Sequence, residues 1–349
     1  MPYTATIQLL DALIDEVSFV SGKQTALKKI DATPPSAPPA TAAKPAVAKA
    51  KAAAAPQAKA AAAKAEAAEK KAADSGAPAP KAAAAVPSPF VGLPATEALY
   101  QTDTYLFNCE AKVLAVEPNA KGDGWVVVLD STCFHPQGGG QPADTGTIAA
   151  LDAGGGGNTS FAVAMVKKDP SGVVLHEGSS QPPPSVAVGS RVKCVVDEKG
   201  RVFNSRVHSA GHLIDVAMTK SGMADKLRPT KGYHFTPGAY VEYDGKLDAA
   251  EREALVPKLQ AAMDELIGEQ IATRVETVDA QKLDTVCPLN ALPPDRSLWG
   301  SGWVRVVCVG GVGCPCGGTH VRDTRELGKV KVEGVKTKGK VTRVSYSME

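Results

Sequence analysis

The sequence predicts an α+β protein in which a small β-barrel precedes an α/β domain with a zinc site, behind a disordered N-terminal extension rich in Ala, Lys and Pro. Short apolar stretches punctuated by Gly and Pro fill residues 93–200 and are typical of a barrel. Helical and strand periodicities alternate after residue 200, where paired His and Cys/His motifs also lie. The predicted segments are an amphipathic helical segment at 1–30, a low-complexity linker at 31–92, the barrel at 93–200 and the zinc-containing domain at 201–349.

The first segment carries one apolar stripe. Between residues 5 and 26, apolar side chains recur at helical spacing: Ile7, Leu10, Leu13, Ile14 and Val17. A single helix cannot bury such a stripe by itself. We therefore expect residues 1–30 to dock on the rest of the chain, on a protein partner or on a second copy, and the sequence does not choose between these.

The linker is dominated by Ala, Lys and Pro. It lacks the large apolar side chains that would offset the entropy of ordering, so we expect it to be disordered. It could act as a semi-rigid spacer. Alternatively, its excess of lysines could attract a polyanion without sequence specificity.

The composition argues for a cytoplasmic protein that does not cross a membrane. Hydrophobic residues make up 44% of the 349 residues, and no apolar run approaches the roughly 18–20 residues of a membrane span. The first residues lack a basic signal region, and acidic residues with no Arg before Arg191 disfavour a mitochondrial presequence. Seven scattered cysteines then favour free thiols and metal ligands over disulfides.

Residues 93–200 contain four predicted strands, at 105–116, 125–129, 161–167 and 191–197. Between the second and third strands lies the stretch FHPQGGGQPADTGTI, in which three glycines precede Gln141. Glycines allow a backbone to approach a ligand closely, although a plain turn between strands would look the same. His135 in this stretch is expected to be solvated.

After residue 200, hydrophobic periodicity predicts the remaining elements. They are a helix at 206–221, a hairpin at 233–244, a helix at 248–270, a strand at 303–309 and a closing hairpin at 329–346.

Two pairs of side chains in this second half could hold one metal ion. His208 and His212 are four residues apart, which puts both imidazoles on one face of the predicted helix. Cys316 and His320 flank two glycines, which permit a tight loop that aims both side chains at one point. Three imidazoles and one thiolate suit zinc, with Cys314 as a rival ligand. Because four protein ligands usually mark a structural zinc, the residues alone leave its role undecided.

These motifs together resemble the editing domain of alanyl-tRNA synthetase and its free-standing AlaX-type relatives. The metal motifs of that family are HxxxH at the start of a helix and CGGTHV; here they are His208 with His212, and residues 316–321 letter for letter. The glycine motif SGGQxGDTG reads GGGQPADTG here, with Ala143 where a glycine is usual. The resemblance covers residues 93–349.

The resemblance implies a trans-editing hydrolase, an aminoacyl-tRNA deacylase that removes serine, and to a lesser extent glycine, from mischarged tRNA(Ala). Such an enzyme corrects a synthetase whose alanine pocket cannot strongly reject either amino acid. It implies one zinc ion per chain, bound by His208, His212, Cys316 and His320. No class II aminoacylation catalytic domain fits in this chain, because the first 92 residues are mostly spacer, so the chain should not charge tRNA.

The glycine motif and the segment PTKGYHF would complete the site. By resemblance and position, the expected catalytic residues are Gln141, Thr230 and His234, and the expected substrate-binding residues are Gly138, Gly139, Gly140 and Tyr233. Two other hypotheses remain open. One is a non-catalytic zinc module that binds tRNA or a protein, and the other is a subunit that works with a synthetase through residues 1–30.

Overall fold

The computed structural model describes residues 90–151, 160–292 and 299–349. The predicted helical segment at 1–30 and nearly all of the predicted linker at 31–92 lie outside the described residues. The described part is a mixed α/β structure, as the sequence predicts. Within these ranges no helix combines the length and the apolar character that crossing a bilayer would require.

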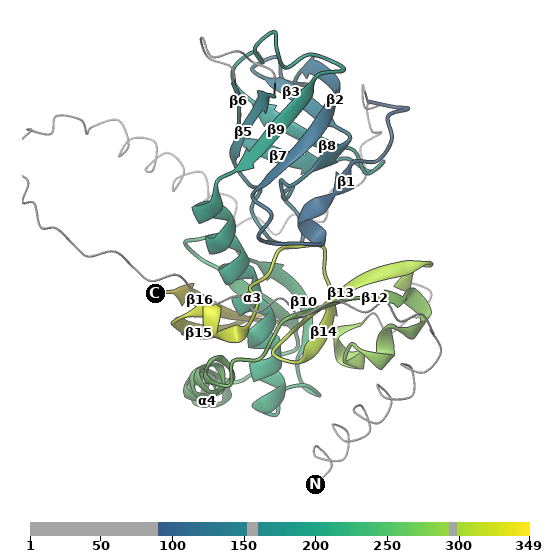
Figure 1. Ribbon diagram of the computed structural model, residues 1–349. Helices are drawn as coiled ribbons and strands as arrows, with labels where there is room; N and C mark the ends of the chain where they lie inside the picture. The colour runs from purple at the N-terminus through teal and green to yellow at the C-terminus, as the bar shows by residue number, and fades with distance from the viewer. Residues whose placement is uncertain (1–89, 152–159, 293–298) are drawn as a thin grey trace, which may run out of the picture. The chain divides into compact units, whose positions relative to one another are not determined.

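The first half forms a seven-stranded antiparallel sheet that nearly closes on itself (Figure 1). Its edge strands β6 and β7 are separated by Ala164 alone, whose N–H donates to the Glu177 carbonyl of β8 at 2.8 Å. Its apolar core includes Val113, Val127, Ile148, Phe161 and Val192. In sheet order the strands are β6 (Ser160–Val163), β5 (Gly146–Ala150), β9 (Arg191–Val196), β2 (Asn108–Pro118), β3 (Trp125–Leu129), β8 (Val174–Gly178) and β7 (Met165–Lys168).

Three of the predicted barrel strands correspond to β2, β3 and β9, and the fourth, at 161–167, is split into β6 and β7. Strands β5 and β8 are not among the ranges that the sequence predicts. Two short strands, β1 (Glu97–Ala98) and β4 (Ser131–Thr132), form a separate parallel pair, and η1 (Leu99–Gln101) follows β1. His135, expected to be solvated, is buried, with its ring 5.2 Å from that of Tyr100.

Strand β9 passes almost directly into the long helix α3 (Glu198–Lys220), as Figure 1 shows. The predicted start at Arg206 was wrong. Gly200 in the first turn weakens the helical pattern, but tertiary contacts stabilise the turn. The buried Arg201 guanidinium donates to both carboxylate oxygens of Asp144, Nε lying 3.1 and 3.0 Å from them. Asp144 belongs to the glycine-rich stretch, so this ion pair fixes that stretch against α3.

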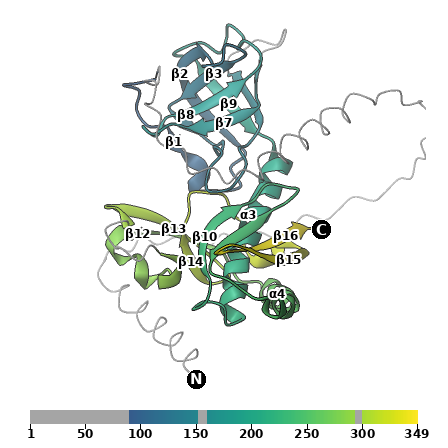
Figure 2. The ribbon, with the colours of Figure 1, turned by 180° about the vertical axis from the view of Figure 1, so that it is seen from behind.

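A four-stranded antiparallel sheet follows, with α4 (Ala249–Gly268) against one edge strand in both ribbon views (Figures 1 and 2). Gln260 of α4 donates to the Val330 carbonyl at 2.9 Å and accepts from the Val332 N–H at 2.8 Å. Both predicted hairpins and the predicted helix are confirmed, although the first hairpin begins at Arg228. The strands in order are β10 (Arg228–Tyr233), β11 (Tyr240–Asp244), β16 (Val341–Met348) and β15 (Val330–Lys338).

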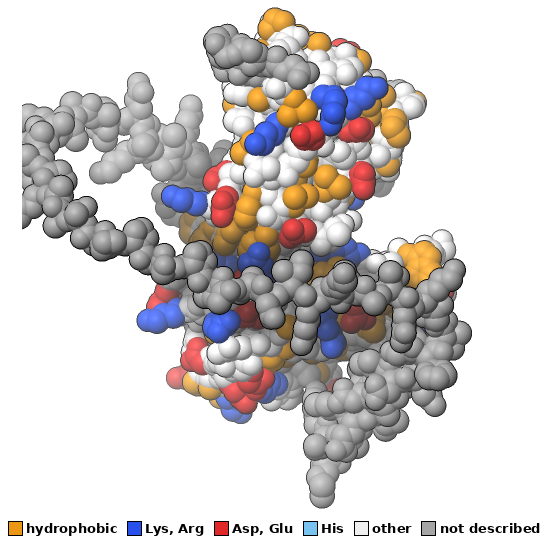
Figure 3. All heavy atoms as spheres, viewed as in Figure 1, with side chains coloured by type: hydrophobic (Ala, Val, Ile, Leu, Met, Phe, Trp, Pro, Cys, Tyr) orange, Lys and Arg blue, Asp and Glu red, His pale blue; other side chains and the backbone are white. Residues whose placement is uncertain are grey.

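A small three-stranded antiparallel sheet leads into the Cys/His motif. It consists of β12 (Arg274–Asp279), β13 (Trp303–Val309) and β14 (Val312–Pro315), and β13 matches the predicted strand. Trp303, the first residue of β13, pairs with Asp279 of β12 and is 75% exposed. Figure 3 shows a hydrophobic patch over the far end of this strand pair. Short 3-10 helices complete the chain: η2 (Ala280–Thr285), η3 (Leu289–Ala291) and η5 (Thr324–Leu327).

Candidate metal centre and adjoining cavity

Helix α3 brings two histidines into contact. His208 and His212 lie about one helical turn apart, with ring centroids 5.0 Å apart and Nε2 atoms 3.3 Å apart. The other faces of α3 supply Val207, Leu213 and Ile214 to the apolar core. Core packing therefore holds the helix rigidly while the two imidazoles face a common point.

The second pair comes from the loop that follows β14. Cys316 Sγ lies 3.2 Å from His320 Nε2 and 3.6 Å from His208 Nε2. Arg305 of β13 fixes this loop, because its Nη1 donates to the carbonyl oxygens of Cys316 and Gly318 at 2.6 and 3.2 Å. The thiol and imidazole are thus anchored to a strand and not left on a mobile turn.

The four ligand atoms match a tetrahedral metal site in number and type and in two of the separations between them, whereas the 3.2 Å between Cys316 Sγ and His320 Nε2 is shorter than such a site has. They all lie within 4.8 Å of one another. Zinc bonds of about 2.0–2.1 Å to nitrogen and about 2.3 Å to sulfur would place tetrahedral ligands about 3.3 Å (N to N) and about 3.6 Å (S to N) apart. The separations from His208 to His212 and from His208 to Cys316 are 3.3 and 3.6 Å. This group could therefore hold a metal ion, and its chemistry suits zinc.

The outer nitrogens of two of these imidazoles are held by hydrogen bonds. His208 Nδ1 lies 2.7 Å from Gln141 Oε1, and His320 Nδ1 lies 3.0 Å from Ser209 Oγ. Gln141 is itself fixed, because Oε1 accepts from the Thr319 N–H at 3.0 Å and Nε2 donates to Thr319 Oγ1 at 2.8 Å. Such bonds set the tautomer and orientation of a ligand ring, so both Nε2 atoms face the cluster.

The two glycines of the CGGTHV motif differ in their surroundings. A Cβ on Gly318 would lie 2.3 Å from Cε1 of His208 and 2.8 Å from Oε1 of Gln141. A Cβ on Gly317 would meet nothing closer than Gln101 Nε2, at 3.4 Å. Close packing against a ligand ring therefore requires glycine at 318 and leaves room at 317.

Burial keeps the imidazoles neutral. It lowers the pKa of His212 to about 4 and, together with the neighbouring histidines, lowers the pKa values of His208 and His320 well below the usual range. Neutral imidazole is the form that binds metal. Burial raises the pKa of the Cys316 thiol, while the Gly318 N–H, 3.3 Å from Sγ, and the Arg305 guanidinium act against that rise.

A cavity of about 260 Å³ opens on this cluster. Its wall includes His208, His212 and Cys316, but not His320. His208 and His320 are buried, whereas His212 and Cys316 are only partly buried. A molecule in the cavity would therefore meet the cluster from the side of His212 and Cys316.

His234 lies in the same wall, with its ring held by two neighbours. Its ring stacks on His208 with centroids 4.5 Å apart, and its Nδ1 lies 2.6 Å from Tyr346 Oη. Tyr346 Oη also lies 3.0 Å from the Val207 carbonyl, and when its one hydrogen goes to that carbonyl, Nδ1 of His234 is the donor in the first bond. Nε2 then carries the lone pair, and no described residue bonds to it. Burial lowers the pKa of His234 to about 3, which keeps the ring neutral.

The glycine-rich loop meets β10 beside the cavity. Gly139 lines the cavity, the Gly140 carbonyl accepts from the His234 N–H at 2.9 Å, and Gly138 forms a β-bridge with Gln141. The loop thus positions Gln141 behind His208 and presents Gly139 to the cavity.

Of the other residues expected at or near the site, Thr230 and Cys314 line the cavity and Tyr233 does not. Thr230 lines the cavity, and its hydroxyl donates to the Glu242 carbonyl at 3.0 Å. Tyr233 is not part of the cavity wall; its ring stacks on Phe235 and Tyr240, with centroids 4.8 and 5.3 Å away. Cys314, the rival ligand, lines the cavity but lies outside the four-residue metal group. The roles expected for these side chains stay predictions.

Three polar residues near the cluster were missed in the sequence. Ser209 and Arg305 position ligands, as described above, and Asp215 lines the cavity. Helical spacing could have indicated Asp215, because it lies seven residues after His208 and therefore on the same face of α3. The other two depend on contacts between distant segments.

Comparison with known proteins identifies the family. A model described as "Threonyl and Alanyl tRNA synthetase second additional domain" matches residues 304–344. The chain is 30% identical over 256 residues to "Alanyl-tRNA editing protein AlaX-M" of Methanosarcina mazei, a match covering 72% of this chain and 95% of that protein. The chain belongs to the alanyl-tRNA editing protein family. This confirms the resemblance drawn from the two metal motifs and the glycine motif.

Longer relatives contain the same region. "Alanyl-tRNA editing protein AlaX-L" of Pyrococcus horikoshii is 29% identical over 242 residues, which cover 68% of this chain and 54% of that protein. "Alanine--tRNA ligase" of Thermofilum pendens is 33% identical over 264 residues, which cover 72% of this chain and 26% of the ligase. This editing-protein chain therefore matches about a quarter of the ligase.

A second model, described as "tRNA synthetases class II (A)", matches residues 42–200. The described part of that match consists of β1, β4, the nearly closed seven-stranded sheet with its connections, and the first residues of α3. The expectation that the chain lacks an aminoacylation domain is not tested by this match and stays a prediction.

Proposed function

We propose that this chain is a trans-editing hydrolase that deacylates mischarged Ser-tRNA(Ala), with Gly-tRNA(Ala) as a lesser substrate, at a zinc site. The observation that carries the proposal is the cavity whose wall contains three members of a group able to bind metal. Its volume of about 260 Å³ is below the roughly 300–1,000 Å³ of sites for drug-sized ligands, which suits a single aminoacyl group. Relatives named for alanyl-tRNA editing support the choice of substrate.

His208, His212, Cys316 and His320 would hold the zinc ion, which would act as a Lewis acid toward the ester carbonyl. Gln141 would orient the metal ligand His208 and would not contact the substrate. Its Oε1 is hydrogen-bonded to His208 Nδ1 and to the Thr319 N–H, and its Nε2 donates to Thr319 Oγ1. We thus assign Gln141 a positioning role in place of the direct catalytic role expected from the sequence.

His234 would distinguish serine from alanine. Its neutral Nε2 can accept a hydrogen bond from the seryl hydroxyl, whereas an alanyl group would leave that nitrogen unpaired. Sites built to bond a hydroxyl reject the analogue that lacks it far better than apolar pockets do. Thr230 lies on the same wall, and because its hydrogen is used by Glu242, its oxygen could also accept from the substrate.

The alternative is a non-catalytic zinc module that binds tRNA or a protein. The observation in its favour is the complete set of four protein ligands, which is typical of structural zinc. The cavity on the His212 and Cys316 side is harder to explain in that case, since a structural site needs no approach for a ligand.

Deacylation assays with the zinc-loaded full-length protein test the proposal. We expect hydrolysis of Ser-tRNA(Ala), slower hydrolysis of Gly-tRNA(Ala) and little of Ala-tRNA(Ala), with loss of activity in chelator and recovery on adding zinc. His234→Phe keeps a ring against His208 but removes the acceptor, so it should reduce the preference for serine over alanine by about tenfold or more. Retained tRNA binding without hydrolysis of either mischarged substrate would instead support the alternative.

A further inference from the structure

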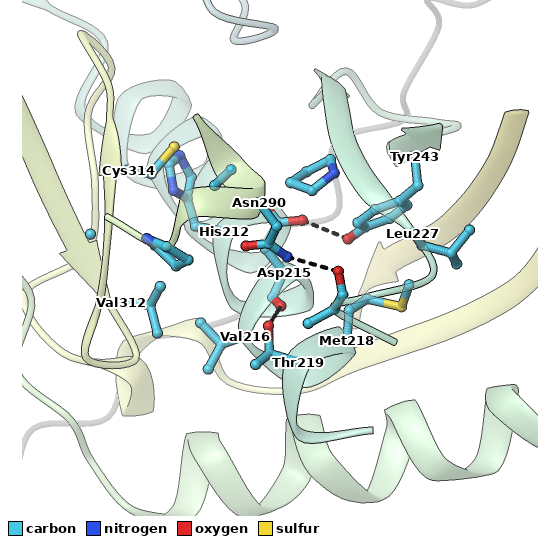
Figure 4. Close-up of a pocket in the computed structure, with 15 residues that line it drawn as sticks. His212, Asp215, Val216, Met218, Thr219, Leu227, Tyr243, Asn290, Val312 and Cys314 are labelled. Atoms are coloured by element: carbon cyan, nitrogen blue, oxygen red, sulfur yellow. Dashed lines mark hydrogen bonds between the residues drawn. The ribbon is translucent and has the colours of Figure 1, made fainter. Parts of the chain in front are cut away.

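Helix α3 carries a further polar side chain, Asp215, on the face that presents His208 and His212. Asp215 lies three residues beyond His212, about 4.5 Å further along the helix axis. It lines the cavity of about 260 Å³ and also a smaller one of about 40 Å³ beside it, shown in Figure 4. The two cavities also share the lining residues Pro229, Ala291 and Cys314, so they are neighbours. Asp215 lies at the boundary between them.

The carboxyl group of Asp215 is held in place by a hydrogen bond to one of its two oxygens. Tyr243 Oη donates to Asp215 Oδ1 at 2.6 Å, the contact drawn in Figure 4. Among the described residues, no side chain forms an ion pair with Asp215, and Tyr243 makes the one hydrogen bond to its side chain, which is partly buried. Of the described residues that line the larger cavity, Asp215 alone carries a carboxyl group.

A carboxylate in this setting favours a cationic ligand. Asp215 is partly buried, and the loss of water around its charged form raises the pKa of the carboxyl group to about 7. Tyr243 supplies one neutral hydrogen bond, which offsets only part of that loss. A cation that enters the cavity would find a fixed carboxylate oxygen with no partner among the described residues.

We propose that Asp215 binds the α-ammonium group of the aminoacyl ester. This inference rests on the proposed function. With the ester carbonyl at the metal cluster, the ammonium group is attached to the adjacent carbon, within reach of a carboxylate one turn along α3 from His212. The hydroxymethyl group branches from that same carbon and remains available to His234. The two contacts together orient the ester, and only the second one differs between serine and alanine.

A comparison of two substrates with zinc-loaded full-length protein tests this contact. The first is Ser-tRNA(Ala), and the second is its α-hydroxy analogue, in which a hydroxyl of similar size replaces the amino group. Wild-type protein should prefer the amino substrate by about 10- to 100-fold in kcat/KM. Asp215→Asn keeps the shape but removes the charge, so it should lower kcat/KM for the amino substrate by a similar factor and leave the analogue within about threefold.

Tyr243→Phe is the matched control, because it removes the hydrogen bond between α3 and β11 but keeps the carboxylate. It should retain the preference for the amino substrate even if stability falls. A non-hydrolysable seryl amide of 3′-amino-3′-deoxyadenosine provides a binding readout: its Kd should rise in Asp215→Asn, whereas the Kd of its α-hydroxy counterpart should not.

Equal loss on both substrates in Asp215→Asn would overturn the inference, because it would indicate a structural role. Equal rates of wild-type protein on the two substrates would overturn it as well, and that comparison requires no variant to fold. In both cases hydrolysis of Ser-tRNA(Ala) by the wild type would leave the proposed function standing. If zinc-loaded wild type hydrolysed neither substrate, the proposed function would fail and the inference with it.

Discussion

Gly318→Ala should disrupt the metal centre while Gly317→Ala should not. The added methyl group at 318 would lie 2.3 Å from Cε1 of His208, and the two atoms must separate by about 1 Å to reach an ordinary van der Waals contact of 3.4 Å. Neither partner can give way easily. His208 is held by Gln141 and by its stack on His234, and the loop is held by Arg305.

The size of this displacement sets the expected effect. Metal–ligand distances in working sites lie within about 0.2 Å of their ideal values, so a shift of about 1 Å removes His208 as a ligand. We therefore expect Gly318→Ala to weaken zinc binding by at least about 100-fold. The methyl group of Gly317→Ala would meet only Gln101 Nε2 at 3.4 Å, so its zinc affinity should stay within about threefold of wild type.

Competition with a chelator of known affinity measures both zinc dissociation constants, and circular dichroism checks that each variant is folded. Wild-type zinc affinity in Gly318→Ala would refute the reasoning, because it would show that the His208 ring is not held where the structure places it. Equal losses in the two variants would refute it as well, since only one of the two positions is crowded.

Three further predictions concern hydrogen bonding, buried charge and pH. Gln141→Leu should lower zinc affinity by about 10- to 100-fold, because His208 loses the acceptor that fixes its tautomer; unchanged affinity in the chelator competition would contradict this. Asp144→Ala should lower the free energy of unfolding by about 3–5 kcal/mol, because it leaves the buried Arg201 unpaired; a loss below about 1 kcal/mol in urea would count against it. Burial lowers the pKa of His176 to about 4 from 6.5, so as pH falls the unfolded state takes up this proton first. The free energy of unfolding therefore keeps its full value above about pH 6.5 and falls as the pH drops toward 4. By pH 5 this group has lowered it by about 2 kcal/mol. His176→Gln should flatten this part of the profile, and an unchanged slope would contradict the assignment.

Local patterns predicted the elements whose periodicity is strong. The predicted strand at 303–309 and the observed strand β13 have the same bounds. Helix α4 begins directly after Asp248, whose side chain caps it by accepting from the Glu251 N–H at 2.8 Å. The two metal pairs could also be predicted locally, because helical spacing places His208 beside His212. In each case the residues that determine the structure are close together in the sequence.

Features that depend on contacts between distant segments could not be predicted in this way. The first turn of α3 contains Gly200 and forms because Arg201 is buried against Asp144, which lies in the barrel. His135 was expected to be solvated because it is flanked by turn residues, but the fold buries it beside Tyr100. The hydrogen bond between Gln141 and His208 likewise forms only when the glycine-rich stretch packs against α3, and no local sequence pattern predicts this packing.

If a metal centre containing Cys316 deacylates mischarged tRNA(Ala), as proposed, removal of this thiol abolishes metal binding and hydrolysis together. The most direct test is the rate of Ser-tRNA(Ala) deacylation by wild type, Cys316→Ala and Cys314→Ala, with the zinc content of each determined in the same preparation. We expect Cys316→Ala to lose both zinc and activity, whereas Cys314→Ala keeps its zinc and continues to hydrolyse the substrate. Full activity in Cys316→Ala, or equal loss in the two variants, would contradict this expectation.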